Sequence, residues 1–218
     1  MNVKTRSIGL LLTGALALGG AAACGSSSSG GSTPKAAASP VADIAKLSGE
    51  HTQVTLNAGF AAALKSLKVT PGLIGTATLD AKTGTLTFPI TGGNVKYYKP
   101  GTVSPYVQGS IDHQGSGFSL TAGGIKVGLS NFVVNPGTSM LTGKVTANGK
   151  VVAASAPLFF LNGRTLQPLA TGPNNTAILN GTKVYLTSTA AALLDKTYNI
   201  TALSSKTLVG VAKITVNT

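Results

Sequence analysis

The chain has 218 residues, enough for one domain of ordinary size or two small ones, and 43% of them are hydrophobic, so a substantial core can form. It carries 17 Lys and Arg against 5 Asp and Glu, a formal net charge of +12, although charged residues make up only 10% of the chain. The single Cys excludes an intrachain disulfide framework and a multi-cysteine metal site, and five acids leave little for carboxylate chemistry.

Residues 1–23 have the three parts of a secretion signal. Lys4 and Arg6 precede the apolar run IGLLLTGALAL at 8–18, and small residues then lead to Cys24. The run is shorter than the roughly 20 apolar residues that a transmembrane helix needs. No paired arginine precedes it, which favours the general secretory route over the twin-arginine route. We therefore assign 1–23 to a signal peptide.

The sequence Ala21-Ala22-Ala23-Cys24 resembles the lipobox of bacterial lipoproteins. The resemblance implies cleavage just before Cys24, a lipid on its thiol and acylation of the new amino terminus. The alternative is an ordinary signal peptide that leaves Cys24 as a free, oxidisable thiol. Two or three acyl chains anchor firmly because each buried methylene adds about 0.8 kcal/mol. We expect the protein at the extracytoplasmic face of the cell membrane, with the membrane as its partner.

The segment after Cys24 has the composition of a flexible tether. Residues 25–40 read GSSSSGGSTPKAAASP and contain almost no bulky apolar side chain, so they cannot form a core. A coil from Cys24 to about Ser48 spans roughly 27 Å. We therefore assign 24–48 to the lipidated Cys and the tether, and 49–218 to a single β-rich extracytoplasmic domain.

From Glu50 onward, turn residues every 8 to 12 positions and short apolar alternation predict a mainly β fold, an antiparallel sandwich or barrel with two short helices. Apolar and polar residues alternate strictly at 85–90 and 124–129, although Pro89 indicates an edge or a bulge. Asn148-Gly149 predicts a two-residue hairpin. Further strands are predicted at 52–56, 74–80, 107–112, 117–121, 131–134, 140–147, 157–161, 182–186 and 207–216.

The two helices are predicted at 58–67, with Asn57 as N-cap, and at 188–195. The segments 54–67 and 184–197 also resemble each other, with Val, Leu and Ala residues matching at a constant offset of 130. One interpretation is chance in an Ala-rich chain. The other is a pair of strand–helix–strand units packed side by side, which would bring the ends of the domain together.

The chain has no motif of a serine hydrolase, zinc protease, P-loop or dinucleotide-binding site, and we predict no enzyme, no catalytic residues and no metal site. The strongest candidate ligand-binding group is Tyr97, Tyr98, Tyr106 and His113, which holds three of the five tyrosines and one of the two histidines. Tyr and His can ligate haem iron. The alternative places the tyrosines in a loop and at a strand end, with His113 exposed in a turn.

A series of short motifs runs through the centre of the chain. It comprises TFPI at 87–90, TGG at 91–93, GSIDHQG at 109–115, an apolar strand at 118–120 and LSNF at 129–132. This order resembles the central part of the HtaA-like haem-acquisition domains of actinobacteria. The resemblance implies a β-rich, membrane- or wall-attached domain with a Tyr iron ligand supported by a His, the latter at His113.

The iron-ligating Tyr of that family lies in an earlier segment, whereas this chain has no Tyr before Tyr97. The expectation is therefore a related scaffold without a cofactor, with haem as the alternative. More broadly, the chain resembles Ala-, Thr- and Gly-rich actinobacterial envelope lipoproteins.

Loss of the signal peptide leaves 15 basic and 5 acidic residues, and 14 of the basic ones are Lys spread between Lys35 and Lys213. Nucleic-acid sites usually cluster Arg and Lys with aromatics, so we predict no nucleic-acid partner. Diffuse positive charge fits anionic wall polymers or lipid head groups, or a solvated surface without a partner. We predict a lipid-anchored, non-catalytic envelope protein, a structural, interaction or binding module; the alternative is a haem- or small-ligand-binding lipoprotein.

Overall fold

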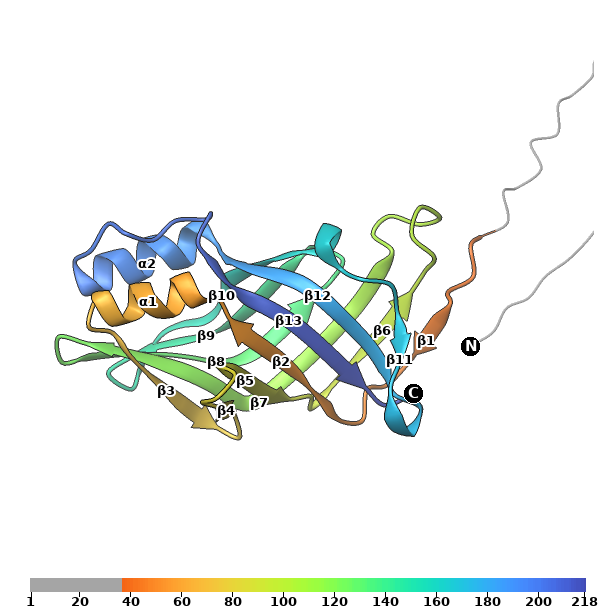
Figure 1. The fold of residues 1–218 in the computed structure, drawn as a ribbon, viewed down its shortest axis with the longest axis horizontal. Coiled ribbons are helices and arrows are strands. Elements are labelled where there is room, and N and C mark those ends of the chain that lie inside the picture. The colour runs from red at the N-terminus through yellow and green to blue at the C-terminus, as the bar shows by residue number, and fades with distance from the viewer. Residues whose placement is uncertain (1–36) are drawn as a thin grey trace, which may run out of the picture. The chain divides into compact units, whose positions relative to one another are not determined.

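The computed structural model describes residues 37–218, which form one curled antiparallel sheet with two helices at one end (Figure 1). The mainly β, antiparallel prediction with two short helices is confirmed, and the sheet has the form of a half-barrel. The predicted signal peptide, Cys24 and the tether up to residue 36 lie outside the described residues. Within residues 37–218, no helix has the length and apolar character needed to cross a membrane.

The sheet contains thirteen strands. They are β1 (Ala42–Ile44), β2 (Glu50–Leu56), β3 (Thr70–Gly75), β4 (Thr78–Asp80), β5 (Thr85–Pro89), β6 (Gly92–Tyr97), β7 (Val107–Ala122), β8 (Ile125–Asn135), β9 (Met140–Ala147), β10 (Lys150–Asn162), β11 (Ala170–Thr171), β12 (Ala177–Leu186) and β13 (Leu208–Val216). Their order across the sheet is β1-β6-β7-β8-β9-β10-β12-β13-β2-β5-β4, with β3 on β7 and β11 on β12.

The curl of the sheet brings its two ends towards each other. Just beyond β5, the backbone N–H of Thr91 donates to the carbonyl of Asp112 in β7 at 2.8 Å. The alternation predicted at 85–90 directs Leu86, Phe88 and Ile90 inward, where all three are buried. A curled sheet can thus surround its own core, so no second sheet is needed to cover the apolar face.

A bulge divides the long strand β7 into two halves. Its register against β8 shifts between His113 and Gly117, so the first half pairs with β6 and the second with β3. Gly117 allows the close approach, because a Cβ there would lie 2.2 Å from the carbonyl oxygen of Leu129. The predicted strands at 107–112 and 117–121 are therefore one bent strand.

The helices α1 (Ala58–Ser66) and α2 (Ser188–Tyr198) lie at the same end of the half-barrel (Figure 1). The predicted N-cap is confirmed: the Asn57 side chain accepts hydrogen bonds from the backbone N–H groups of Gly59 and Phe60 at 2.9 and 3.2 Å. The Thr187 hydroxyl accepts from Ala190 N in the same way at 3.0 Å. Both caps follow directly on a strand.

The two similar segments occupy equivalent places in the sheet. The strands β2 and β12 both pair with β13, and each is followed by a helix. The pairing of Gly210 with Leu56 joins the last strand to the start of the domain. The two strands therefore flank β13 and the ends of the domain meet, as the side-by-side interpretation predicts, but β3, which follows α1, pairs with β7 and not with β2.

The ordered sheet extends into the segment assigned from sequence to the tether. The short strand β1 pairs with β6, and Leu47 is only 2% exposed. The two glycines of the TGG motif at 91–93 begin β6. The sequence does not indicate either strand. With three residues, β1 is too short to show an alternation of apolar and polar side chains, and the pair Gly92-Gly93 at the start of β6 is typical of a turn. Only the partner strand reveals why Gly93 is needed, because a Cβ there would lie 2.0 Å from the carbonyl oxygen of Ser110.

Two further segments are short 3-10 turns, η1 (Gly163–Thr165) after β10 and η2 (Pro173–Asn175) before β12. The buried residues form two clusters inside the half-barrel. One includes Phe60 and Leu64 of α1 with Phe132 and Phe159 of the sheet, and the other lies around Ile111.

Candidate binding cavity

A cavity of about 720 Å³ lies inside the half-barrel. Its lining residues come from nine strands, from α1 and from the connections between strands, and most are aliphatic or aromatic. The apolar wall includes Val54, Phe60, Leu64, Leu86, Phe88, Phe118, Leu120, Phe132, Leu141, Phe159, Leu161, Val184 and Ile214. The volume is in the range of small-molecule binding sites, about 300–1,000 Å³, which are also mostly apolar.

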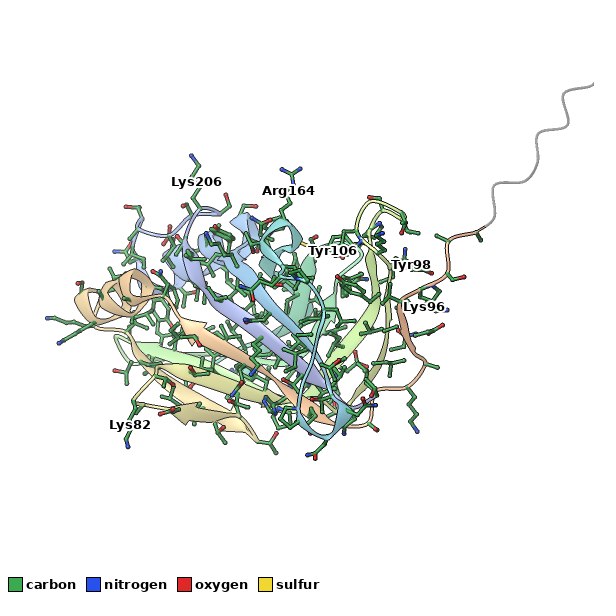
Figure 2. The ribbon with its side chains drawn as sticks, turned by 45° about the vertical axis from the view of Figure 1, so that its right-hand side comes forward. Lys82, Lys96, Tyr98, Tyr106, Arg164 and Lys206 are labelled. Atoms are coloured by element: carbon green, nitrogen blue, oxygen red, sulfur yellow. The ribbon has the colours of Figure 1, made fainter. Side chains whose placement is uncertain are left out.

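Polar residues of the lining gather where three connections meet. The β6–β7 loop contributes Ser104 and Tyr106, the β8–β9 turn contributes Ser139, and the region of η1 contributes Asn162 and Arg164. We call these five residues the mouth. Among residues 37–218, Arg164 is the only charged residue in the lining. Figure 2 shows its guanidinium directed outward from the ribbon, on the same upper side as Tyr106.

The turn that carries Arg164 is held by local hydrogen bonds. The Asn162 side chain accepts from the backbone N–H of Arg164 at 3.2 Å. The Thr165 hydroxyl donates to the Asn162 carbonyl and accepts from the backbone N–H of Lys183, both at 2.9 Å. These bonds fix η1 against β12 and keep Arg164 at the mouth.

Tyr106 connects two sides of the mouth. Its hydroxyl donates to the carbonyl of Gly163 at 2.9 Å, and its ring meets that of Tyr97 edge to face at a centroid separation of 5.9 Å. Burial raises the pKa of the Tyr106 phenol, so the ring is neutral at neutral pH. Tyr98 is half-buried, donates its backbone N–H to the carbonyl of Tyr106 at 2.7 Å, and is not part of the cavity lining.

His113 lies away from the mouth. It is 1% exposed, so the alternative of an exposed turn is wrong. Its Nδ1 lies 3.0 Å from the carbonyl oxygen of Pro89, which can only accept, and its Nε2 lies 3.2 Å from the Thr52 hydroxyl. The ring is therefore satisfied as a neutral imidazole with the proton on Nδ1. Burial lowers the pKa of His113 and so favours this neutral form.

The four predicted ligand-binding residues thus do not form one cluster. Tyr97 and Tyr106 are in contact, whereas His113 lies further along β7 and does not line the cavity. The assignment of a ligand to these four residues stays a prediction. Sequence reasoning missed Arg164, although it is the only Arg after the signal peptide.

The acidic side chains of residues 37–218 make contacts elsewhere, and none lines the cavity. Asp43 pairs with Lys96 at 3.0 Å, Glu50 lies 3.4 Å from His51, Asp80 accepts within its own turn, Asp112 accepts from Ser110 and Asp195 accepts from Leu203 N. The hydrogen bond from Thr83 lowers the pKa of Asp80. Within the described residues, no three His, Cys, Asp or Glu side chains lie close enough together to hold a metal ion.

Comparisons with known proteins identify the fold. No protein-family model matches the chain, and no curated protein matches it. Among solved structures, the crystal structure of the C-terminal domain of HtaA from Corynebacterium glutamicum superposes with a TM-score of 0.56 at 14% identity. The match covers 78% of this chain and 97% of the HtaA domain. The resemblance predicted from the central motifs is therefore confirmed at the level of the fold.

Proposed function

We propose that the protein is a lipid-anchored, extracytoplasmic, non-catalytic module that binds a small apolar ligand inside the half-barrel. The observation that carries this proposal is the apolar cavity of about 720 Å³ with its polar mouth. Contact between the apolar wall and water is unfavourable. A ligand that covers the wall gains about 25 cal/mol of binding free energy per Å² of apolar surface removed from water. Polar groups at the mouth would orient such a ligand.

The composition of the lining supports binding without catalysis. Its polar members are the five mouth residues with Thr52 and Thr182, and within residues 37–218 the lining includes no Asp, Glu or His. General acid–base chemistry usually depends on one of these side chains within hydrogen-bonding distance of the substrate.

The half-barrel cavity is tested with a polarity-sensitive fluorescent probe such as anilinonaphthalene sulfonate. We expect saturable binding to the wild-type protein and strong loss in Thr182→Phe, because the larger ring would fill the lining near the mouth. The matched control is Thr78→Phe, since Thr78 is exposed on β4 and does not line the cavity. Equal binding by both variants, with both folded by circular dichroism, would contradict the proposal.

Haem is a second candidate for the same cavity, favoured by the position of Tyr106 in its wall. Titration of hemin should then produce a Soret shift that Tyr106→Phe alters. Absence of the shift, or an unchanged shift in Tyr106→Phe and His113→Ala, rejects haem.

A further inference from the structure

We infer that the ligand is a single-chain amphiphile whose acyl tail occupies the half-barrel cavity and whose anionic head, a carboxylate or a phosphate, lies at Arg164. This inference rests on the proposed function and adds the chemical class of the ligand. It is carried by the placement of one charged side chain at the mouth of an otherwise uncharged cavity.

The extent of the lining favours a long apolar chain. At one end the lining includes Phe60 and Leu64 of α1, and at the mouth it includes Tyr106 and Arg164. In Figure 1, α1 and the β6–β7 loop lie towards opposite ends of the half-barrel. A ligand that fills the cavity must therefore extend along the interior. An acyl chain does so, and each methylene that it buries in the apolar lining adds to the affinity.

The charges around the mouth favour an anionic head. The acids of residues 37–218 make other contacts, so Arg164 has no acidic partner among them. The backbone N–H of Lys183 is bonded to the turn that carries Arg164, so the charge that the lining offers a ligand is that of Arg164. The described domain carries 14 basic and 5 acidic side chains, so its overall field also attracts anions.

The same geometry argues against haem as the occupant. The Tyr106 phenol donates to Gly163, and burial raises its pKa, which opposes the phenolate form that binds ferric iron. His113 is bonded at both ring nitrogens and lies outside the lining. An acyl chain requires neither residue.

The test compares amphiphiles with similar tails below their micelle concentrations: oleate, oleoyl lysophosphatidic acid and uncharged monoolein. We expect the anionic ligands to bind the full-length mature protein more tightly than monoolein. The variant Arg164→Gln should weaken the binding of the anionic ligands about two- to fivefold and leave monoolein unchanged, because the guanidinium is exposed to solvent. The ranking of oleate against lysophosphatidic acid distinguishes a carboxylate from a phosphate head.

Lys82→Gln is the matched control, because it removes one exposed charge on the opposite side of the domain (Figure 2). It should change none of the affinities. Equal affinity for oleate and monoolein, or equal losses for both in Arg164→Gln, would overturn the anionic head while the cavity proposal stands. Tighter binding of hemin than of every acyl ligand, with displacement of oleate, would overturn the acyl tail. If neither the amphiphiles nor the fluorescent probe bind, the proposed function itself fails.

Discussion

The burial of His113 is the clearest case of a single residue whose environment differs from what its sequence context suggests. Adjacent to Asp112 and followed by Gln-Gly, it has the setting of an exposed turn residue. The structure instead places it against Phe88, Thr52 and Pro89, at the β7 bulge. The role of this neutral histidine is therefore to satisfy buried hydrogen-bonding groups at the point where the sheet ends approach each other.

This burial makes the stability of the fold depend on pH. The pKa of His113 is lowered in the folded state, whereas the unfolded chain takes up the proton near pH 6.5. Below about pH 6.5 the unfolded state therefore binds more protons, and stability falls on acidification until the lowered folded pKa is reached. Urea midpoints measured between pH 7.5 and 5 should decrease. His113→Gln should be less stable than the wild type at pH 7.5, and its urea midpoint should change less with pH. An equal dependence of the midpoint on pH in both proteins would contradict this role.

Gly117 gives a second test at the scale of one residue. Because Gly117 has no Cβ, β7 and β8 can approach each other at the bulge. A Cβ added at this position would lie only 2.2 Å from the carbonyl oxygen of Leu129. Gly117→Ala should lower the free energy of unfolding by about 1–3 kcal/mol, because the strands must separate. Gly163→Ala is the control, since nothing lies within 4 Å of its added Cβ. Similar losses in both variants, measured by urea unfolding, would refute the steric explanation.

At the scale of elements, the helices and most strands follow from local pattern. The turn at Asn148-Gly149 joins Ala147 and Lys150 as a two-residue hairpin, with positive φ at both turn residues, as predicted. The helix starting after Asn57 is indicated by its cap and its spaced apolar residues. By contrast, β1 forms because it pairs with β6, and β6 forms because it also pairs with β7; no local pattern indicates these pairings.

The N-cap of α1 is testable by substitution. Asn57→Ala removes the acceptor for two backbone N–H groups and should reduce the free energy of unfolding by about 1 kcal/mol. Asn57→Asp keeps the acceptor and should remain close to the wild type. Chemical denaturation followed by circular dichroism measures both, and an undiminished Asn57→Ala protein would show that the cap contributes nothing.

At the scale of the whole molecule, the proposed binding module combines the half-barrel with the predicted lipid anchor. The anchor would hold the cavity near a membrane, where amphiphiles are concentrated. The excess of basic side chains in residues 37–218 fits the anionic surface expected there.

Membrane attachment is tested by Cys24→Ser, which removes the only thiol that can carry a lipid. We expect the variant to leave the membrane fraction and appear in the soluble fraction, because the acyl chains predicted on Cys24 would be lost. Immunoblotting of cell fractions measures the change, with Ser26→Ala as the control in the same segment. Retention of Cys24→Ser in the membrane fraction would contradict lipid anchoring.

The sequence by itself determined the mainly β class, the two helices with the Asn57 cap of the first, and the candidate lipid-attachment site, because these depend on alternation, turn residues and short motifs along the chain. Only the tertiary structure decided that Tyr106 lies at a cavity mouth with Arg164, that His113 is buried and that β1 belongs to the sheet. Tyr106 and Arg164 are 58 positions apart, and they meet because the sheet curls and brings the β6–β7 loop to η1. That curl depends on long-range strand pairing, which local sequence does not encode.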